Sequence, residues 1–166
     1  KFRFSPNTCC DAEIIAYDNK PSKSTHTLEE TVNKSDFIFL SVPTPANKDG
    51  SINIDILSDV LDDISKVHDG KQNYILIRST IIPGTTWSLQ EKFPNLNLLF
   101  NPEFLTERSA NFDFINQSRF IIGSGDTDAS ALGSELFSQL IKDRFGNCVA
   151  ILETTYETAE MIKYMN

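Results

Sequence analysis

The chain has 166 residues, of which 40% are apolar, and its formal net charge is −8 with a pI near 4.7. This length suits one domain with its own core, while the excess of carboxylates argues against nucleic-acid and anionic-membrane partners, which attract lysine and arginine. No apolar run approaches the ~20 residues of a membrane-spanning helix, and Cys9, Cys10 and Cys148 show no C-x-x-C spacing, so we expect a reducing, cytoplasmic protein without a disulfide framework.

Strand-like apolar runs and helix-like periodic segments alternate along the chain. In chain order we predict strand 12–18, helix 27–33, strand 36–43, helix 53–67, strand 73–80, helix 84–92, strand 97–100, strand 119–123, helix 126–143, strand 148–152 and helix 154–166. Several strand segments are continuously apolar, which is typical of strands covered on both faces. The pattern predicts an α/β fold of Rossmann-like, doubly wound type with a mainly parallel sheet.

The glycine-rich loop of such a fold is not found in the sequence. Dinucleotide-binding folds usually open with G-x-G-x-x-G after the first strand, so that the backbone can approach the pyrophosphate. No glycine precedes Gly50. We therefore expect the first strand and its glycine-rich loop to be lacking from this chain.

The helix predicted at 53–67 carries several aspartates. Its apolar residues recur three and four positions apart, so one stripe faces the core and the aspartates face water. An acidic face of this kind is more typical of a solvated surface than of a metal site. We expect no metal.

Ligands of doubly wound sheets bind beyond the carboxyl ends of the strands, and polar residues follow several predicted strands. Asp18 could accept hydrogen bonds from the ribose hydroxyls of NAD and repel the 2′-phosphate of NADP, or it could simply form a turn. Val42 and Thr44 lie in "SVPTP", where two prolines keep the backbone extended. This segment either presents Thr44 to a ligand or is a structural turn.

The stretch "RSTIIPGTT" places Ser79 and Thr80 at the end of the next strand. Their hydroxyls could contact a nicotinamide, a substrate hydroxyl or a water, and hydroxyls in this stretch could equally cap the following helix. The stretch "NPEFLTE" carries Glu103 and Glu107, which would share a helical face and repel each other mildly if this segment is helical. Such a pair is either exposed or placed for a purpose, since a partly desolvated carboxylate can orient or deprotonate a water.

Five motifs occur together in one order: "FIFLSVPTP", "IRSTIIPGTT", "NPEFLTE", "SRFIIG" and "TAEMIKY". In order and spacing they resemble the UDP-glucose/GDP-mannose dehydrogenase family, over about residues 12–166. The resemblance implies an NAD-binding domain at 1–153, incomplete at its N-terminus, and the start of a linking helix at 154–166. It further implies NAD as cofactor and a nucleotide-sugar substrate, most simply UDP-glucose, whose C6 alcohol is oxidised through a thioester.

The resemblance also implies roles for individual residues. Glu103 matches a glutamate tied to thioester hydrolysis, Thr80 a threonine that positions the water, and Lys163 a lysine that stabilises an oxyanion. Without the resemblance, Lys163 would be read as an ordinary surface lysine. The cofactor-binding residues are expected to be Asp18, Val42, Thr44, Ser79, Thr80 and Glu107. The substrate-binding residues are expected to be Phe104, Leu105, Glu107 and Lys163.

The chain departs from the family pattern in two ways. Arg108 stands where the family has glycine, and none of the three cysteines lies in the glycine-rich motif of the family's catalytic cysteine. We therefore expect this polypeptide not to turn over substrate alone. Another NAD(P)-dependent sugar or 3-hydroxyacid dehydrogenase, and a non-catalytic binding or assembly subunit, stay open as alternatives. The family also implies a homodimer through the linking helix, and for Arg119 no chemistry is predicted.

Overall fold

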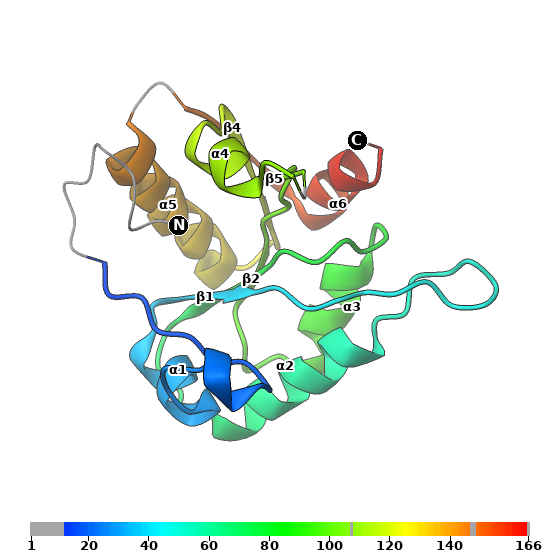
Figure 1. The fold of residues 1–166 in the computed structure, drawn as a ribbon, viewed down its shortest axis with the longest axis vertical. Helices are drawn as coiled ribbons and strands as arrows, with labels where there is room; N and C mark the ends of the chain where they lie inside the picture. Colours follow the sequence, from blue (N-terminus) through cyan, green and yellow to red (C-terminus); the bar gives the residue numbers. More distant parts are fainter. Residues whose placement is uncertain (1–11, 107, 147–148, 166) are drawn as a thin grey trace.

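The computed structural model describes residues 12–106, 108–146 and 149–165, which form a five-stranded sheet with helices on both faces (Figure 1). The strands are β1 (Phe37–Leu40), β2 (Tyr74–Ile77), β3 (Leu98–Phe100), β4 (Arg119–Ser124) and β5 (Ala150–Thr155). The helices are the 3-10 turn η2 (Pro21–Lys23), α1 (Leu28–Lys34), α2 (Asp55–Val67), α3 (Thr85–Lys92), α4 (Ala110–Ile115), α5 (Asp128–Phe145) and α6 (Tyr156–Tyr164). Cys9, Cys10 and Cys148 lie outside the described residues.

The strands lie side by side in chain order, and the sheet is mainly parallel. β1, β2 and β3 pair in parallel, β4 runs antiparallel to β3, and β5 is parallel to β4. Because β1 to β3 share one direction, their carboxyl ends meet at one edge, and the segments that follow them are brought together there.

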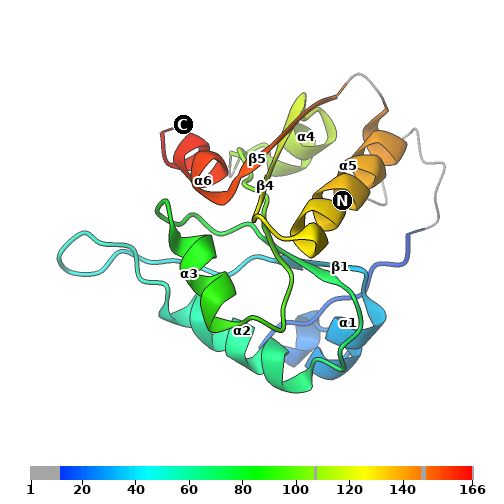
Figure 2. The same cartoon turned by 180° about the vertical axis from the view of Figure 1, so that it is seen from behind.

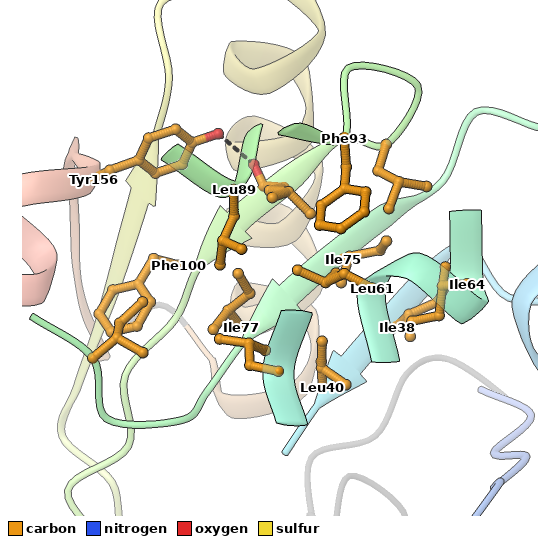
Figure 3. Packing of buried hydrophobic residues seen from close by; sticks show 14 of the residues in the cluster. Ile38, Leu40, Leu61, Ile64, Ile75, Ile77, Leu89, Phe93, Phe100 and Tyr156 are labelled. Atoms are coloured by element: carbon orange, nitrogen blue, oxygen red, sulfur yellow. Dashed lines mark hydrogen bonds between the residues drawn. The ribbon is translucent and has the colours of Figure 1, made fainter. Parts of the chain in front are cut away.

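Each face of the sheet has its own hydrophobic core. Ile75 and Ile77 point to the face covered by α2, α3 and α6 (Figures 2 and 3). Tyr74 and Leu76 point to the face covered by α5. β2 is buried along its whole length. Burial on both faces accounts for the continuous apolar run in the sequence, because apolar and polar residues alternate only in strands with one face exposed to water.

One predicted strand is wrong. Residues 12–18 form no strand, and Ile14 and Tyr17 are about half exposed. The carbonyl oxygen of Ala16 instead accepts hydrogen bonds from the backbone N–H groups of Thr25 (2.8 Å) and His26 (3.2 Å). A strand needs a neighbouring ladder, and here a loop satisfies the backbone in place of one.

Other boundaries differ by a few residues. α6 begins at Tyr156 instead of residue 154, since Thr154 and Thr155 continue β5. The short helix α4 was not predicted, and the antiparallel β3–β4 pair departs from strict strand–helix alternation. Across the described parts of the chain, no helix is both long and apolar enough to cross a membrane.

Gly133 is a position where the fold tolerates no side chain. It lies in α5 against the buried ring of Tyr74, and an added Cβ would overlap Tyr74 Cδ1. Gly133→Ala should therefore lower the free energy of unfolding by about 2 kcal/mol through overpacking, although alanine is the better helix former. Urea denaturation measures this change.

Ser138→Ala, in the same helix, is the matched control. The Ser138 hydroxyl is buried and has no hydrogen-bond partner within the described parts of the chain. Its removal should leave stability unchanged or raise it by about 1 kcal/mol, because an unsatisfied polar group leaves the core. Equal stability of Gly133→Ala and the wild type would contradict the packing described above.

Candidate active site

A cavity of about 330 Å³ lies at the carboxyl ends of the parallel strands. Its lining comes from the segment after β1, the segment after β2, the segment after β3 and helix α6. The lining residues are Ser41, Val42, Pro43, Thr44, Arg78, Ser79, Thr80, Glu103 and Lys163. Six of these were predicted as site residues from the sequence, although they come from four separate segments.

Hydroxyl groups tie the first two of these segments together. Ser79 Oγ donates to the carbonyl oxygen of Val42 (2.6 Å) and accepts from the Val42 N–H (3.1 Å), which extends the β1–β2 pairing beyond the strands. Thr44 Oγ1 donates to the carbonyl oxygen of Thr80 (2.8 Å). Since its proton is used in this way, the Thr44 hydroxyl can meet a ligand only as an acceptor.

The charged centre of the cavity is a pair formed by Arg78 and Glu103. Arg78 Nη2 lies 3.2 Å from Glu103 Oε2, and Nη1 donates to Asn101 Oδ1. Asn101 is fully buried and donates through Nδ2 to the carbonyl oxygen of Ile121 in β4 (2.8 Å). Burial lowers the pKa of the Arg78 guanidinium, and the neighbouring Glu103 carboxylate opposes that effect.

Sequence reasoning missed Arg78. The signal was available, because a charge inside the apolar run "YILIRST" must find a partner if that run is buried. Its partner stands 25 residues later in the chain, which no local pattern reveals.

Lys163 lies beside the main chain of Glu103. Its Nζ donates to the carbonyl oxygen of Glu103 (2.5 Å) and stands 5.4 Å from the centre of the Phe104 ring. The guanidinium of Arg119 lies over the same ring at 4.9 Å. Arg119, for which no chemistry was predicted, thus packs against the proposed substrate segment.

Phe104 and Leu105 line a second cavity, of about 320 Å³, together with Arg119 and residues of α4. They do not line the first cavity, although Phe104 follows Glu103 directly. The adjacent residues Glu103 and Phe104 therefore line different cavities.

Among the described residues that were predicted as site residues, Asp18 is not brought into either cavity. Asp18 Oδ1 accepts from the backbone N–H of Lys20 (2.8 Å), which is the turn that the sequence left open as an alternative. Glu107 lies outside the described residues. Residues 101–106 are not helical, so this part of the segment does not meet the condition under which the two glutamates of "NPEFLTE" would share a helical face.

A cluster of hydrogen bonds at the start of α4 explains this irregular segment. Thr106 Oγ1, the Thr106 N–H and Ser109 Oγ all donate to Asp113 Oδ2. These donors lower the pKa of the Asp113 carboxyl. The chain is thereby held in a turn just before the helix begins.

Glu160 fixes α6 to the rest of the site. Its carboxylate is completely buried and accepts from the backbone N–H groups of Gly84 (2.6 Å) and Thr86 (2.7 Å), at the start of α3. Free N–H groups at a helix N-terminus favour a carboxylate. Tyr156 Oη also donates to the carbonyl oxygen of Leu98 (2.7 Å; Figure 3), so α6 is held at both α3 and β3, with Lys163 facing the first cavity.

Sequence reasoning missed Glu160 as well, because a charged residue in a helix is usually solvated. Its spacing from Tyr156 and Ala159 places all three on one face of α6, and that face is buried. The signal was therefore the periodicity of the apolar neighbours.

Burial raises the pKa of Glu160, and its two N–H donors only partly oppose this. A carboxyl whose pKa rises on folding makes its largest contribution to the free energy of unfolding below its ordinary pKa of 4.5. This contribution falls as the pH rises through the pKa of the folded state. Glu160→Gln, whose amide cannot accept both bonds, should cost about 1–3 kcal/mol in acid. The deficit should shrink as the pH rises above about 4.5 and through the raised folded-state pKa of Glu160.

Paired urea titrations of the wild type and Glu160→Gln at several pH values measure this deficit. The carboxyls common to both proteins cancel in the difference. Glu135→Gln, at an exposed position of α5, is the control and should show no comparable deficit. A deficit that grows with pH would contradict the burial effect.

Residues 14–141 match the model of the "UDP-glucose/GDP-mannose dehydrogenase family, NAD binding domain". The chain is 31% identical over 155 residues to a UDP-glucose 6-dehydrogenase of Rickettsia prowazekii. It is 35% identical over 137 residues to an uncharacterized protein of Methanocaldococcus jannaschii. The matches cover 91% and 80% of this chain, and 35% and 15% of those proteins, respectively. The chain thus spans about a third or less of the curated relatives that it matches.

Solved structures agree with the sequence matches. The GDP-mannose dehydrogenase of Pseudomonas aeruginosa superposes with a TM-score of 0.72 at 25% identity, over 83% of this chain and 33% of that one. The UDP-glucose dehydrogenase of Pyrobaculum islandicum gives 0.67 at 26% identity, over 85% and 33%. These findings confirm the Rossmann-like fold and NAD as the cofactor of the matched domain. The chain therefore belongs to the UDP-glucose/GDP-mannose dehydrogenase family.

Proposed function

We propose that the chain supplies the NAD-binding part of a nucleotide-sugar 6-dehydrogenase that oxidises UDP-glucose to UDP-glucuronate. The observation that carries the proposal is the first cavity, where Thr80, Glu103 and Lys163 meet at the carboxyl ends of parallel strands. A hydroxyl, a carboxylate and a cation around one cavity suit the oxidation of an alcohol and the hydrolysis of an acyl intermediate.

The residues of the cavity suit part of a dinucleotide. Val42, Thr44 and Ser79 would hold the cofactor, because they place backbone and hydroxyl groups where such folds bind nucleotides. NAD, when bound, accepts a hydride from the substrate carbon. Asp18 is proposed to meet the adenosine ribose through its second carboxylate oxygen, since Oδ1 accepts from Lys20. Glu107 is proposed as a further contact.

Three side chains would act on the substrate. The Glu103 carboxylate, 42% exposed, would take a proton from a water that the Thr80 hydroxyl orients. The Lys163 ammonium, fixed beside the Glu103 carbonyl, would stabilise the negative charge that develops on the substrate oxygen. Phe104 and Leu105 are proposed to line the sugar side, in the second cavity.

The test uses the full-length gene product with NAD and, separately, UDP-glucose, UDP-N-acetylglucosamine and GDP-mannose. We expect NADH to form fastest with UDP-glucose, and NADP to support little turnover. NADH formation with only one of the other nucleotide sugars would overturn the assignment of UDP-glucose as the substrate. Binding of NAD without turnover of any sugar would instead support a non-catalytic subunit.

A homodimer is proposed for the complete protein. Met161, Tyr164 and Met165 of the α6 region are exposed, as are Ile82 and Trp87 at the adjoining α3 end. Exposed apolar side chains favour association. Sedimentation of the full-length protein should give twice the monomer mass, and a monomer would contradict the proposal.

A cytoplasmic location is likewise proposed, from the cysteine pattern alone.

A further inference from the structure

We infer that Arg78 is a positioning residue, which holds the Glu103 carboxylate in one place inside the first cavity. The inference rests on the proposed function, because it assigns Arg78 a purpose through Glu103. Neither the family match nor the names of the relatives gives Arg78 a role.

The Arg78 guanidinium is itself surrounded and hydrogen-bonded on several sides. Its side chain is 7% exposed, against 42% for its partner Glu103, so a buried cation holds a half-exposed anion. Asn101 Oδ1 accepts a hydrogen bond from Arg78 Nη1. Asn101 Nδ2 in turn donates to the carbonyl oxygen of Ile121 in β4. The ring of Phe39 lies 5.9 Å from the guanidinium carbon.

The main chains of Arg78 and Asn101 continue the hydrogen bonding of the sheet. The Arg78 N–H donates to the carbonyl oxygen of Leu40 (3.0 Å), and the Asn101 N–H donates to that of Ile77 (2.9 Å). Both residues therefore continue the β1–β2 and β2–β3 ladders past the last strand residue. A side chain that starts from such a position has little freedom to move sideways.

Glu103 is consequently held at two points. Arg78 fixes its carboxylate, and Lys163 fixes its carbonyl oxygen. A buried guanidinium without a counterion would be strongly unfavourable, so the contact with Arg78 also keeps the Glu103 side chain at the first cavity. A base that must be aimed at a water gains from this placement.

Arginine suits this task better than lysine. Its planar fork reaches Asn101 and Glu103 with two different nitrogens at once, whereas an ammonium is a compact point charge. Lysine at this position should keep the charge next to Glu103 but lose part of the orientation.

Four variants of the full-length gene product test the inference: Arg78→Met, Arg78→Lys, Glu103→Gln and the double variant Arg78→Met/Glu103→Gln. We expect Arg78→Met to lower kcat at least about tenfold, with the KM for NAD changed by no more than about twofold. Arg78→Lys should recover part of the loss. The double variant should be no slower than Glu103→Gln alone, because both changes remove the same placed carboxylate.

A readout that does not depend on turnover is the position of Glu103. A crystal structure of Arg78→Met should show the Glu103 side chain moved from its wild-type place. Thermal unfolding checks that the variant folds, and Arg78→Lys serves if it does not. Lys66→Met, on the exposed face of α2, is the charge control and should keep wild-type turnover.

The outcomes separate the two proposals. Wild-type kcat in folded Arg78→Met, an unmoved Glu103, or losses that add in the double variant would each overturn the role of Arg78. Wild-type turnover in Glu103→Gln would instead overturn the proposed function of Glu103.

Discussion

Glu103→Gln is expected to lower kcat of the full-length protein by about a hundred- to a thousandfold while leaving the fold intact. The carboxylate is the proposed base of the first cavity, and general-base catalysis is typically worth factors of this size. Glutamine has nearly the same shape but cannot take up a proton. The change therefore removes the chemistry and keeps the geometry.

The fold should survive because the Arg78 guanidinium keeps an acceptor. The glutamine Oε1 can replace Glu103 Oε2 at the 3.2 Å contact, although the hydrogen bond loses its negative partner. Steady-state kinetics give kcat, and thermal unfolding should show only a small shift.

Glu91→Gln, at an exposed position of α3, is the matched control and should leave kcat unchanged. A higher KM for the sugar with unchanged kcat would mean that Glu103 contributes to uniform binding only. That result would contradict its role as a base.

The sheet could be predicted from sequence where burial imposes a simple pattern. The apolar run that contains β2 and the helical stripe of α2 were both recognised, because each element is covered by neighbours in the way its pattern implies. Residues 12–18 show the same kind of apolar run but form no strand, because strand formation depends on a hydrogen-bonding neighbour. Local pattern alone does not reveal whether a neighbour exists.

The candidate site, like the sheet, could be predicted from the sequence only in part. Polar residues after strands could be predicted to meet, since parallel strands end at one edge, and the cavity contains them. Arg78 and Glu160 could not be found in this manner, because each owes its place to a partner far away in the chain. Their importance arises from the pairing of a buried charge with that distant partner, and only the packed structure displays the pairing.

The anchoring of α6 has a consequence for Lys163. Glu160 joins α6 to the start of α3, and Lys163 stands about one helical turn further on. The ammonium is thus carried into the cavity by a helix that is fixed at a second point. A cation that is already in place needs no rearrangement when charge develops on the substrate.

Lys163→Met is therefore expected to lower kcat by about a hundred- to a thousandfold, because a fixed donor is lost from the developing oxyanion. Methionine keeps much of the aliphatic length, so contact with Phe104 should persist and the loss should fall on kcat more than on the KM for NAD. Steady-state kinetics of the full-length protein measure both, with Lys92→Met as the control outside the two cavities. Unchanged kcat with weaker NAD binding would place Lys163 with the cofactor contacts instead.

Glu160→Gln, which loosens the anchor but keeps the ammonium, should give a smaller loss of kcat than Lys163→Met, because the cation stays but is held less firmly.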